Sequence, residues 1–192
     1  MDPTKKSAYK VVRYILEKKE FTQRGISEAT GASLGGVNYT VKWLIARRYV
    51  AREKNRYKLV AAGGLLSLFQ LNRRMEDKRI ASFNISADRK QVLKFMKEKG
   101  AVLCLTTALQ EYDSYFRDPS VKVYGDEKLA AELKGMEHGY AQVEIYRNDL
   151  GDSKDIITKN GFRMTSETRT VIDLFCSNLA YAAEQLVRRN WA

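Results

Sequence analysis

The chain of 192 residues contains only two cysteines, one histidine and two prolines. Cys104 and Cys176 each lie in an apolar segment, so we expect two buried thiols rather than a disulfide. With His138 as the single histidine, they form no zinc-binding pattern, and we expect neither a metal nor another cofactor. The scarcity of proline and the lack of low-complexity segments indicate a chain that is folded over most of its length.

Long apolar runs are also missing. No uninterrupted apolar run approaches the roughly 18 residues that a membrane helix needs, so we expect no membrane partner. The N-terminus reads Met-Asp-Pro-Thr-Lys-Lys with no apolar stretch behind it, so we expect no secretory signal. The expected location is therefore the cytoplasm.

Basic residues are in excess, and the excess is concentrated in one part of the chain. The sequence has 34 Lys and Arg against 23 Asp and Glu, a net charge of +11. Residues 1–60 hold 14 basic and 5 acidic residues, whereas residues 61–192 hold 20 and 18. A concentrated positive field attracts polyanions such as DNA. A solvated basic surface without a partner has the same composition. The sequence motif in residues 1–60 therefore has to distinguish a DNA-binding domain from such a surface.

Residues 1–60 are predicted to form a winged helix-turn-helix. Apolar spacing predicts a helix over 7–19, followed by two helices that Thr22 and Ser33 are placed to cap. Gly31 stands where a glycine commonly ends a helix. Two β-prone runs around a polar turn then predict a hairpin over 49–60. This order of helices and hairpin is typical of a winged helix-turn-helix.

The third of these helices has an apolar face and an open face. On a helical wheel one arc of roughly 100° holds the residues that we expect to be buried: Leu34, Val37, Val41, Leu44 and Ile45. Gly35 and Gly36 lie in its first turn, and each costs about 1 kcal/mol relative to alanine. That cost is consistent with a helix tip that approaches another surface closely. In this motif the tip enters the major groove of DNA.

The candidate DNA-binding residues come from three places. Asn38 can bridge two edge atoms of adenine, and Tyr39 or Lys42 can reach a phosphate or a base. The start of the second helix can contact the DNA backbone, and the turn of the hairpin can reach an adjacent groove or phosphates. The predicted set is Thr22, Gln23, Arg24, Ser33, Gly35, Gly36, Asn38, Tyr39, Lys42, Lys54, Asn55 and Arg56. A helical module used for protein contacts is the alternative.

The same segment resembles a known family. The runs over 22–27 and 30–39, followed by Leu44-Ile45 and Tyr49-Val50, are similar to the winged helix of MarR-type bacterial and archaeal regulators. The resemblance covers residues 8–60, where the cap, the turn glycine and the apolar positions agree together. It implies this fold, a prokaryotic source and binding to double-stranded DNA, without implying an operator sequence.

The remaining chain is expected to hold a connecting helix over 61–78 and a second domain over 79–192. Strand-like and helical segments alternate there, which favours a mixed α/β domain and an α+β class for the whole chain. Expected strands span 79–85, 101–105, 121–124, 142–146 and 156–164, and expected helices span 86–99, 107–115, 126–134, 166–177 and 179–189.

No catalytic constellation stands out in the second domain. It lacks a glycine-rich phosphate loop, and a lone histidine gives poor support for base-activated serine or cysteine chemistry. Metal-dependent nucleotidyl transfer would need closely spaced carboxylates. The nearest groups, which we interpret as acidic surface, are Glu111 with Asp113 and the set Asp149, Asp152 and Asp155. We therefore expect no catalytic residue and no enzyme.

The segment 165–175 carries a second resemblance. Thr165 or Ser166 can cap a helix, and Arg169 and Asp173 have the spacing of a surface ion pair worth a few tenths of a kcal/mol. The segment also resembles the Ser-Pro-Glu-Arg-Thr-x-x-Asp pattern of the AbiEi family, the antitoxins of type IV toxin–antitoxin systems, although Glu167 and Thr168 replace its Pro and Glu. The resemblance implies binding to the protein's own promoter, with a second domain that either supports repression or neutralises a nucleotidyltransferase toxin. A plain regulator without a toxin is the alternative.

Three functional hypotheses follow. The leading one is a sequence-specific DNA-binding transcriptional regulator, with the antitoxin role implied by the second resemblance. The second is a regulator whose second domain senses a small ligand, and the third is a nucleic-acid-modifying enzyme that docks through its winged helix. Winged-helix proteins often meet DNA as symmetric dimers, so a homodimer is a further expectation.

Overall fold

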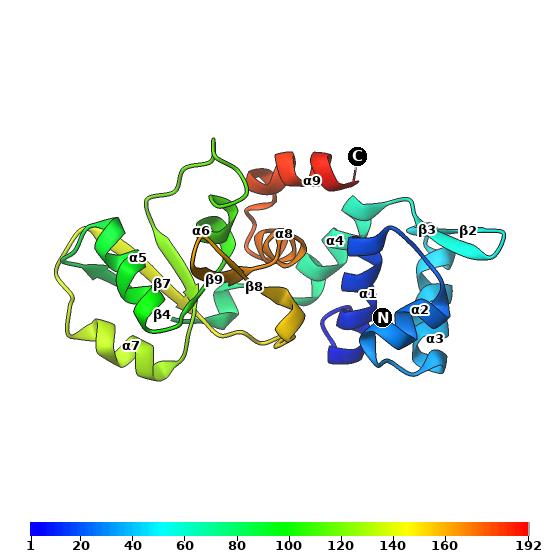
Figure 1. Cartoon of the computed structure of the whole chain (residues 1–192), viewed down its shortest axis with the longest axis horizontal. Coiled ribbons are helices and arrows are strands. Elements are labelled where there is room, and N and C mark those ends of the chain that lie inside the picture. Colours follow the sequence, from blue (N-terminus) through cyan, green and yellow to red (C-terminus); the bar gives the residue numbers. More distant parts are fainter. Residues whose placement is uncertain (192) are drawn as a thin grey trace. The chain divides into compact units, whose positions relative to one another are not determined.

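The computed structural model describes residues 1–191 and divides the chain into two compact units. The units are Met1–Arg73 and Arg74–Asn190, with Trp191 grouped with the first. Both contain helices and strands (Figure 1), so the expected α+β class is confirmed. Among the described residues, no helix combines the length and the apolar character needed to cross a membrane.

The first unit, Met1–Arg73, consists of helices and a small sheet. The three strands are antiparallel and have the order β1-β3-β2. The sequence did not predict the two-residue strand β1, which makes β3 the central strand. Helix α4 lies in the segment expected to connect the domains and belongs to this unit. The elements are α1 (Lys6–Lys18), β1 (Glu20–Phe21), α2 (Gln23–Thr30), α3 (Leu34–Ala46), β2 (Val50–Glu53), β3 (Arg56–Leu59) and α4 (Ala62–Asn72).

Local side-chain chemistry sets the limits of α2 and α3. Thr22 Oγ1 accepts a hydrogen bond from the Gly25 amide at 3.0 Å, and Ser33 Oγ accepts one from the Gly36 amide at 3.2 Å. Both predicted caps are therefore confirmed. Gly31 ends α2 with a φ of 70°, in the left-handed region that glycine adopts without steric cost.

The core of the first unit lies between its helices. Val37, Val41 and Leu44 are fully buried on α3, as expected. Leu34 was expected on the same face but is 55% exposed, so that expectation is wrong. Leu34 is the first residue of the helix, and a wheel gives only the direction of a side chain and not whether a neighbour covers it.

Gly64 in α4 provides space rather than flexibility. A Cβ at this position would lie 2.6 Å from Cε1 of Tyr49, closer than side chains tolerate. The Tyr49 ring lies in turn 6.3 Å from the Trp43 ring on α3, measured between centroids. The glycine therefore allows α4 to pack against the aromatic residues beside α3.

The second unit, described over Arg74–Asn190, is built on a six-stranded mixed sheet. Its strand order is β4-β7-β6-β5-β9-β8, with β6–β7 and β5–β9 parallel and the other pairs antiparallel. The elements after Arg73 are η1 (Glu76–Lys78), β4 (Arg79–Ile85), α5 (Arg89–Glu98), β5 (Val102–Leu103), α6 (Leu105–Leu109), β6 (Val121–Tyr124), α7 (Glu127–Lys134), β7 (Ala141–Tyr146), η2 (Ser153–Asp155), β8 (Ile156–Lys159), β9 (Phe162–Thr165), α8 (Glu167–Cys176), η3 (Ala180–Ala183) and α9 (Glu184–Trp191).

Several expected elements of this unit are wrong in extent. The strand expected over 101–105 is the two-residue β5, and the helix expected over 179–189 is η3 followed by α9. The strand expected over 156–164 is the hairpin β8–β9, because Asn160 and Gly161 have φ values of 52° and 75° and form its turn. The helix expected over 107–115 is the five-residue α6. Beyond α6, Asp113 Oδ1 accepts a hydrogen bond from the Tyr115 amide at 2.9 Å, a local bond that competes with helix formation.

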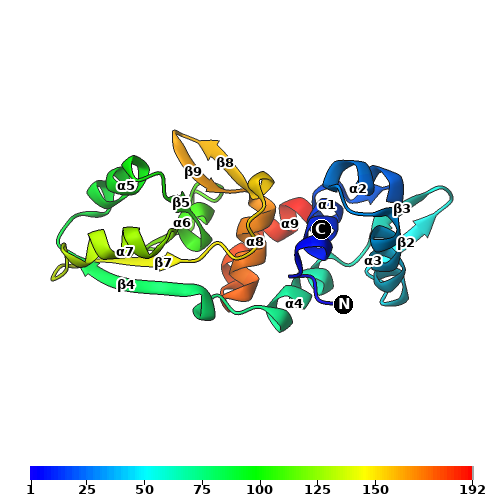
Figure 2. The same cartoon turned by 90° about the horizontal axis from the view of Figure 1, so that it is seen from below.

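The sheet has one apolar and one polar face near its centre. Val123 and Val143 belong to an apolar cluster with Met96 on α5 and Leu133 on α7. Helices α5 and α7 lie beside β4 and β7 in both views (Figures 1 and 2). Because strand residues alternate, Lys122, Tyr124, Glu144 and Tyr146 face the other side.

Cys104 and Cys176 both lie in the interior of the second unit. Their exposed fractions are 0% and 2%, and neither thiol is part of a disulfide. The expected burial of these two residues is therefore confirmed, in line with the usual behaviour of cysteine as a small hydrophobic residue.

Candidate nucleic-acid interface

The start of α3 presents backbone donors and little side-chain bulk. The first amides of a helix have no partner within it, and Ser33 takes that of Gly36. The amides of Leu34 and Gly35 remain available to an anion at the positive end of the helix. A Cβ on Gly35 would meet no atom within 4 Å, so the surface in front of this residue is open.

Asn38 lies half-buried on α3 and is connected to two other elements through Gln23. Gln23 Nε2 donates to Asn38 Oδ1 at 3.4 Å and to the Tyr57 hydroxyl at 3.2 Å. The Asn38 oxygen accepts a hydrogen bond inside the protein, whereas its Nδ2 group has no bond to a described residue. Gln23, which the sequence predicts at the DNA backbone, thus lies beside the residue expected to read a base.

Tyr39 and Lys42 occupy the open face of α3. Tyr39 is 64% exposed, and Lys42 is exposed as well. On the same helix Trp43 is half-buried, and the Arg47 guanidinium carbon lies 3.7 Å from the centroid of its ring. The tyrosine and the lysine are therefore the long side chains of this face that stay accessible to a partner.

The predicted hairpin residues lie at the turn between β2 and β3, which extends away from the helices of the first unit in Figure 1. Lys54, Asn55 and Arg56 are all exposed, and Lys54 has a φ of 47°, as turn residues can. Beside the turn, the rings of Phe21 on β1 and Tyr57 on β3 stack with centroids 5.8 Å apart. Tyr57, which Gln23 also contacts, therefore lies directly after the cationic turn.

The start of α2 contributes the exposed residues Thr22 and Arg24. The Thr22 hydroxyl caps the helix, and Arg24 Nε pairs with Glu28 Oε1 at 2.8 Å. The Arg24 and Glu28 side chains are 87% and 65% exposed. An exposed pair of this kind contributes little to stability, so Arg24 can exchange its carboxylate partner for a phosphate.

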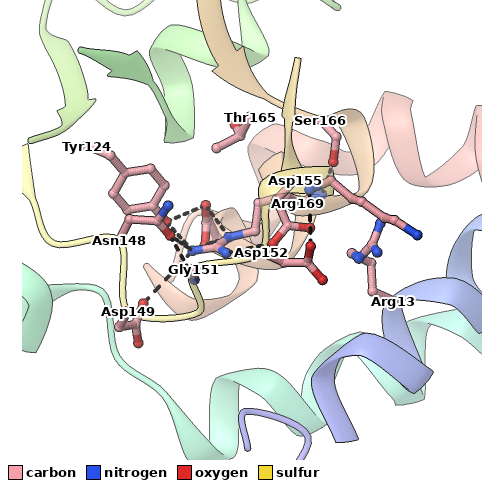
Figure 3. A network of polar contacts seen from close by, with 12 residues as sticks. Arg13, Tyr124, Asn148, Asp149, Gly151, Asp152, Asp155, Thr165, Ser166 and Arg169 are labelled. Carbon is pink, nitrogen blue, oxygen red and sulfur yellow. Dashed lines mark hydrogen bonds and ion pairs between the residues drawn. The ribbon is translucent and has the colours of Figure 1, made fainter. Parts of the chain in front are cut away.

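A separate polar cluster in the second unit centres on Arg169 (Figure 3). Arg169 and Asp173 are 0% exposed, so the expected surface ion pair is wrong and the pair is buried. Arg169 Nε donates to the two Asp173 carboxylate oxygens at 2.9 and 3.0 Å. Its Nη1 donates to Asp155 Oδ2 at 3.2 Å and its Nη2 to the Tyr124 hydroxyl at 2.6 Å.

This cluster also corrects the interpretation of the acidic residues before β8. Asp155 is 1% exposed and therefore does not belong to an acidic surface. The Tyr124 hydroxyl donates a hydrogen bond to Asp173 Oδ2 at 2.7 Å, and Asp149 Oδ1 lies 3.9 Å from Arg169 Nη2. Burial of charges is costly unless they are paired. The network thus stabilises the join between β6, α8 and the segment before β8, a structural role that the spacing of Arg169 and Asp173 alone could not show.

The candidate interface consists of the start of α2, the open face of α3 and the hairpin turn. Hydrogen bonds from Gln23 on α2 to Asn38 on α3 and to Tyr57 on β3 join these elements. Within residues 1–191, no group of three or more His, Cys, Asp or Glu side chains is placed to hold a metal ion. No family model, curated protein or solved structure matches this chain.

Proposed function

We propose that this chain is a sequence-specific double-stranded DNA-binding protein that regulates transcription, and that α1 to α3 with β1 to β3 act as a winged helix-turn-helix. One observation carries the proposal. The basic excess of residues 1–60 occurs in the same unit as an α3 start with an exposed glycine and unpartnered amides. Positive charge without an open helix start, or an open helix start without positive charge, would support DNA binding far less.

In the proposed complex the start of α3 enters the major groove. Asn38 donates through Nδ2 to a base edge, while Gln23 holds its oxygen and fixes the plane of the amide. Gln23 is thus a positioning residue for the base contact. The exposed cations of the hairpin turn, Lys54 and Arg56, neutralise phosphates without reading sequence.

The second unit is proposed to be an interaction domain without catalytic activity, in a protein of the prokaryotic cytoplasm. A nucleotidyltransferase toxin is the partner that the antitoxin resemblance suggests. Arg169 and Asp173, which carry that resemblance, are buried, so their role in such a complex would be to stabilise the domain rather than to touch the partner.

The test is selection of bound sequences from a random duplex pool by the full-length protein. We expect one enriched motif, and we expect Asn38→Ala to change the ranking of competing duplexes. Lys90→Ala is the matched control, because Lys90 is an exposed cation of the second unit. Absence of binding to any duplex at low ionic strength would overturn the proposal, and an unchanged ranking for Asn38→Ala would remove the base-reading role of Asn38.

A further inference from the structure

The second unit contains a hollow of about 470 Å³ beside the start of α5. Its volume falls in the range of small-molecule binding sites. The lining side chains come from the first residue of α5, from the end of α6 and from the loop that follows: Arg89, Gln110, Glu111, Arg117, Asp118 and Pro119.

The two carboxylates of this lining already have partners. Asp118 accepts hydrogen bonds from Lys122 Nζ at 2.7 Å and from the hydroxyl groups of Thr106 and Ser120, each at 2.6 Å. Burial on its own would raise the pKa of Asp118, but these hydrogen bonds outweigh it and lower the pKa to about 2. Glu111 Oε2 accepts from Asn160 Nδ2 at 2.9 Å. Asp118 therefore has its own cation in Lys122, whereas Glu111 is held by a neutral amide and keeps its charge.

The two guanidinium groups, by contrast, keep most of their donors. Arg89 Nη2 donates to Gln110 Oε1, whereas Arg89 Nε is buried without a hydrogen-bond partner among the described residues. Arg117 has one hydrogen bond, from Nη1 to the carbonyl oxygen of its neighbour Phe116 at 2.9 Å. Because Arg89 Nε is closed off from solvent, the donors that Arg89 can offer to the hollow are those of its Nη groups.

The start of α5 is itself occupied. Asp88 Oδ1 accepts from the Gln91 amide at 2.8 Å, and Gln91 Oε1 accepts from the Asp88 amide at 2.9 Å, which together form a capping box. The Asp88 carboxylate thus already faces the positive end of the helix. Any anion in the hollow would depend on the arginine side chains and not on the helix start.

We propose that this hollow binds the phosphate group of a small phosphate monoester, with Arg89 and Arg117 as the binding residues. Two guanidinium groups match the charge of a phosphate dianion, and their planar forks pair with its oxygens in parallel hydrogen bonds. Gln110 holds Arg89 on one side and donates through Nε2 to the Asp118 carbonyl at 2.9 Å on the other, so it is the positioning residue. The remaining volume accommodates the group esterified to the phosphate.

The test uses the full-length protein in phosphate-free buffer, with inorganic phosphate, adenosine monophosphate and adenosine as probes in isothermal titration calorimetry. We expect binding of the two phosphate probes and none of adenosine. Arg89→Gln and Arg117→Gln should each weaken binding about tenfold or more, the loss typical of a charged hydrogen bond. Lys90→Gln is the control, since Lys90 is an exposed neighbour on α5 outside the lining.

Equal affinity of both arginine variants and the wild type, or equal binding of adenosine, would overturn the proposal. Displacement of phosphate by a short duplex, with loss of duplex affinity in Arg117→Gln, would identify a DNA contact and overturn it as well. Should Arg89→Gln not fold, Arg117→Gln decides, because Arg117 lies in an exposed loop position. If the winged-helix proposal fails instead, these variants still differ from the wild type in phosphate binding, so the two failures are distinguishable.

Discussion

An alanine in place of Gly35 would add one methyl group to the exposed start of α3. The free protein has room for it, since no atom lies within 4 Å of the new Cβ. Alanine is favoured over glycine in a helix by about 1 kcal/mol. For a chain of this length a gain of about 1 kcal/mol raises Tm by roughly 2–4 °C. Gly35→Ala should therefore make the protein more stable.

The same methyl group should weaken DNA binding, because it stands where the helix start is proposed to meet the groove. Loss of one hydrogen bond from this backbone to a phosphate, about 1.5 kcal/mol, corresponds to about a tenfold rise in Kd. Thermal unfolding followed by circular dichroism and fluorescence anisotropy with the selected duplex would measure the two effects. Opposite signs for stability and affinity are the signature expected of a surface kept small for a partner.

Gly63→Ala is the matched control. Gly63 is the second residue of α4, as Gly35 is of α3, and its Cβ would likewise meet nothing within 4 Å. It should raise Tm to a similar extent and leave DNA affinity unchanged. A Gly35→Ala protein that is more stable and binds DNA as tightly as the wild type would refute the close approach of this helix to DNA.

Three further outcomes are expected. Lys54→Ala should weaken binding to every duplex alike and reduce the slope of log K against log salt by about 0.9, and an unchanged slope in a salt series would remove the phosphate contact. Arg169→Met leaves the Asp173 and Asp155 carboxylates buried without Arg169, so it should lower the free energy of unfolding in urea by about 3–5 kcal/mol. A decrease below about 1 kcal/mol would contradict the role of the network. Because the pKa of Asp118 lies below its ordinary 3.8, the stability that its carboxylate contributes is present above pH 3.8 and is lost as the pH falls toward 2. In Asp118→Asn the free energy of unfolding should therefore change less with pH over this range.

The elements that the sequence predicts best are those with local causes. Thr22, Ser33, Asp126 and Ser166 each cap the helix that follows, and each cap depends on residues at most three positions away. The Asn160-Gly161 turn is equally local, and Asn-Gly between two β-prone runs is a strong hairpin signal that the prediction of one strand over 156–164 did not use. Capping chemistry thus fixes where these four helices begin.

The features that the sequence could not predict depend on tertiary packing, which determines whether a given side chain is buried or exposed. The spacing of Arg169 and Asp173 fits an exposed pair and a buried pair equally well, and only the sheet packed against α8 distinguishes them. The contact between Gln23 and Asn38 likewise joins residues 15 positions apart on different helices. The sequence therefore predicts each candidate DNA-binding residue separately. The hydrogen bond by which one of them holds another is seen only in the folded structure.

The buried guanidinium of Arg169 also constrains which amino-acid replacements this protein can accept during evolution. Its carboxylate partners come from segments that lie apart along the chain, and the loss of Arg169 leaves both carboxylates in the interior without this cation. Single replacements are therefore penalised, although simultaneous replacement by apolar residues of similar volume would be tolerated. Descendants of this chain should either keep the whole set or have exchanged it together, and intermediate combinations should be rare.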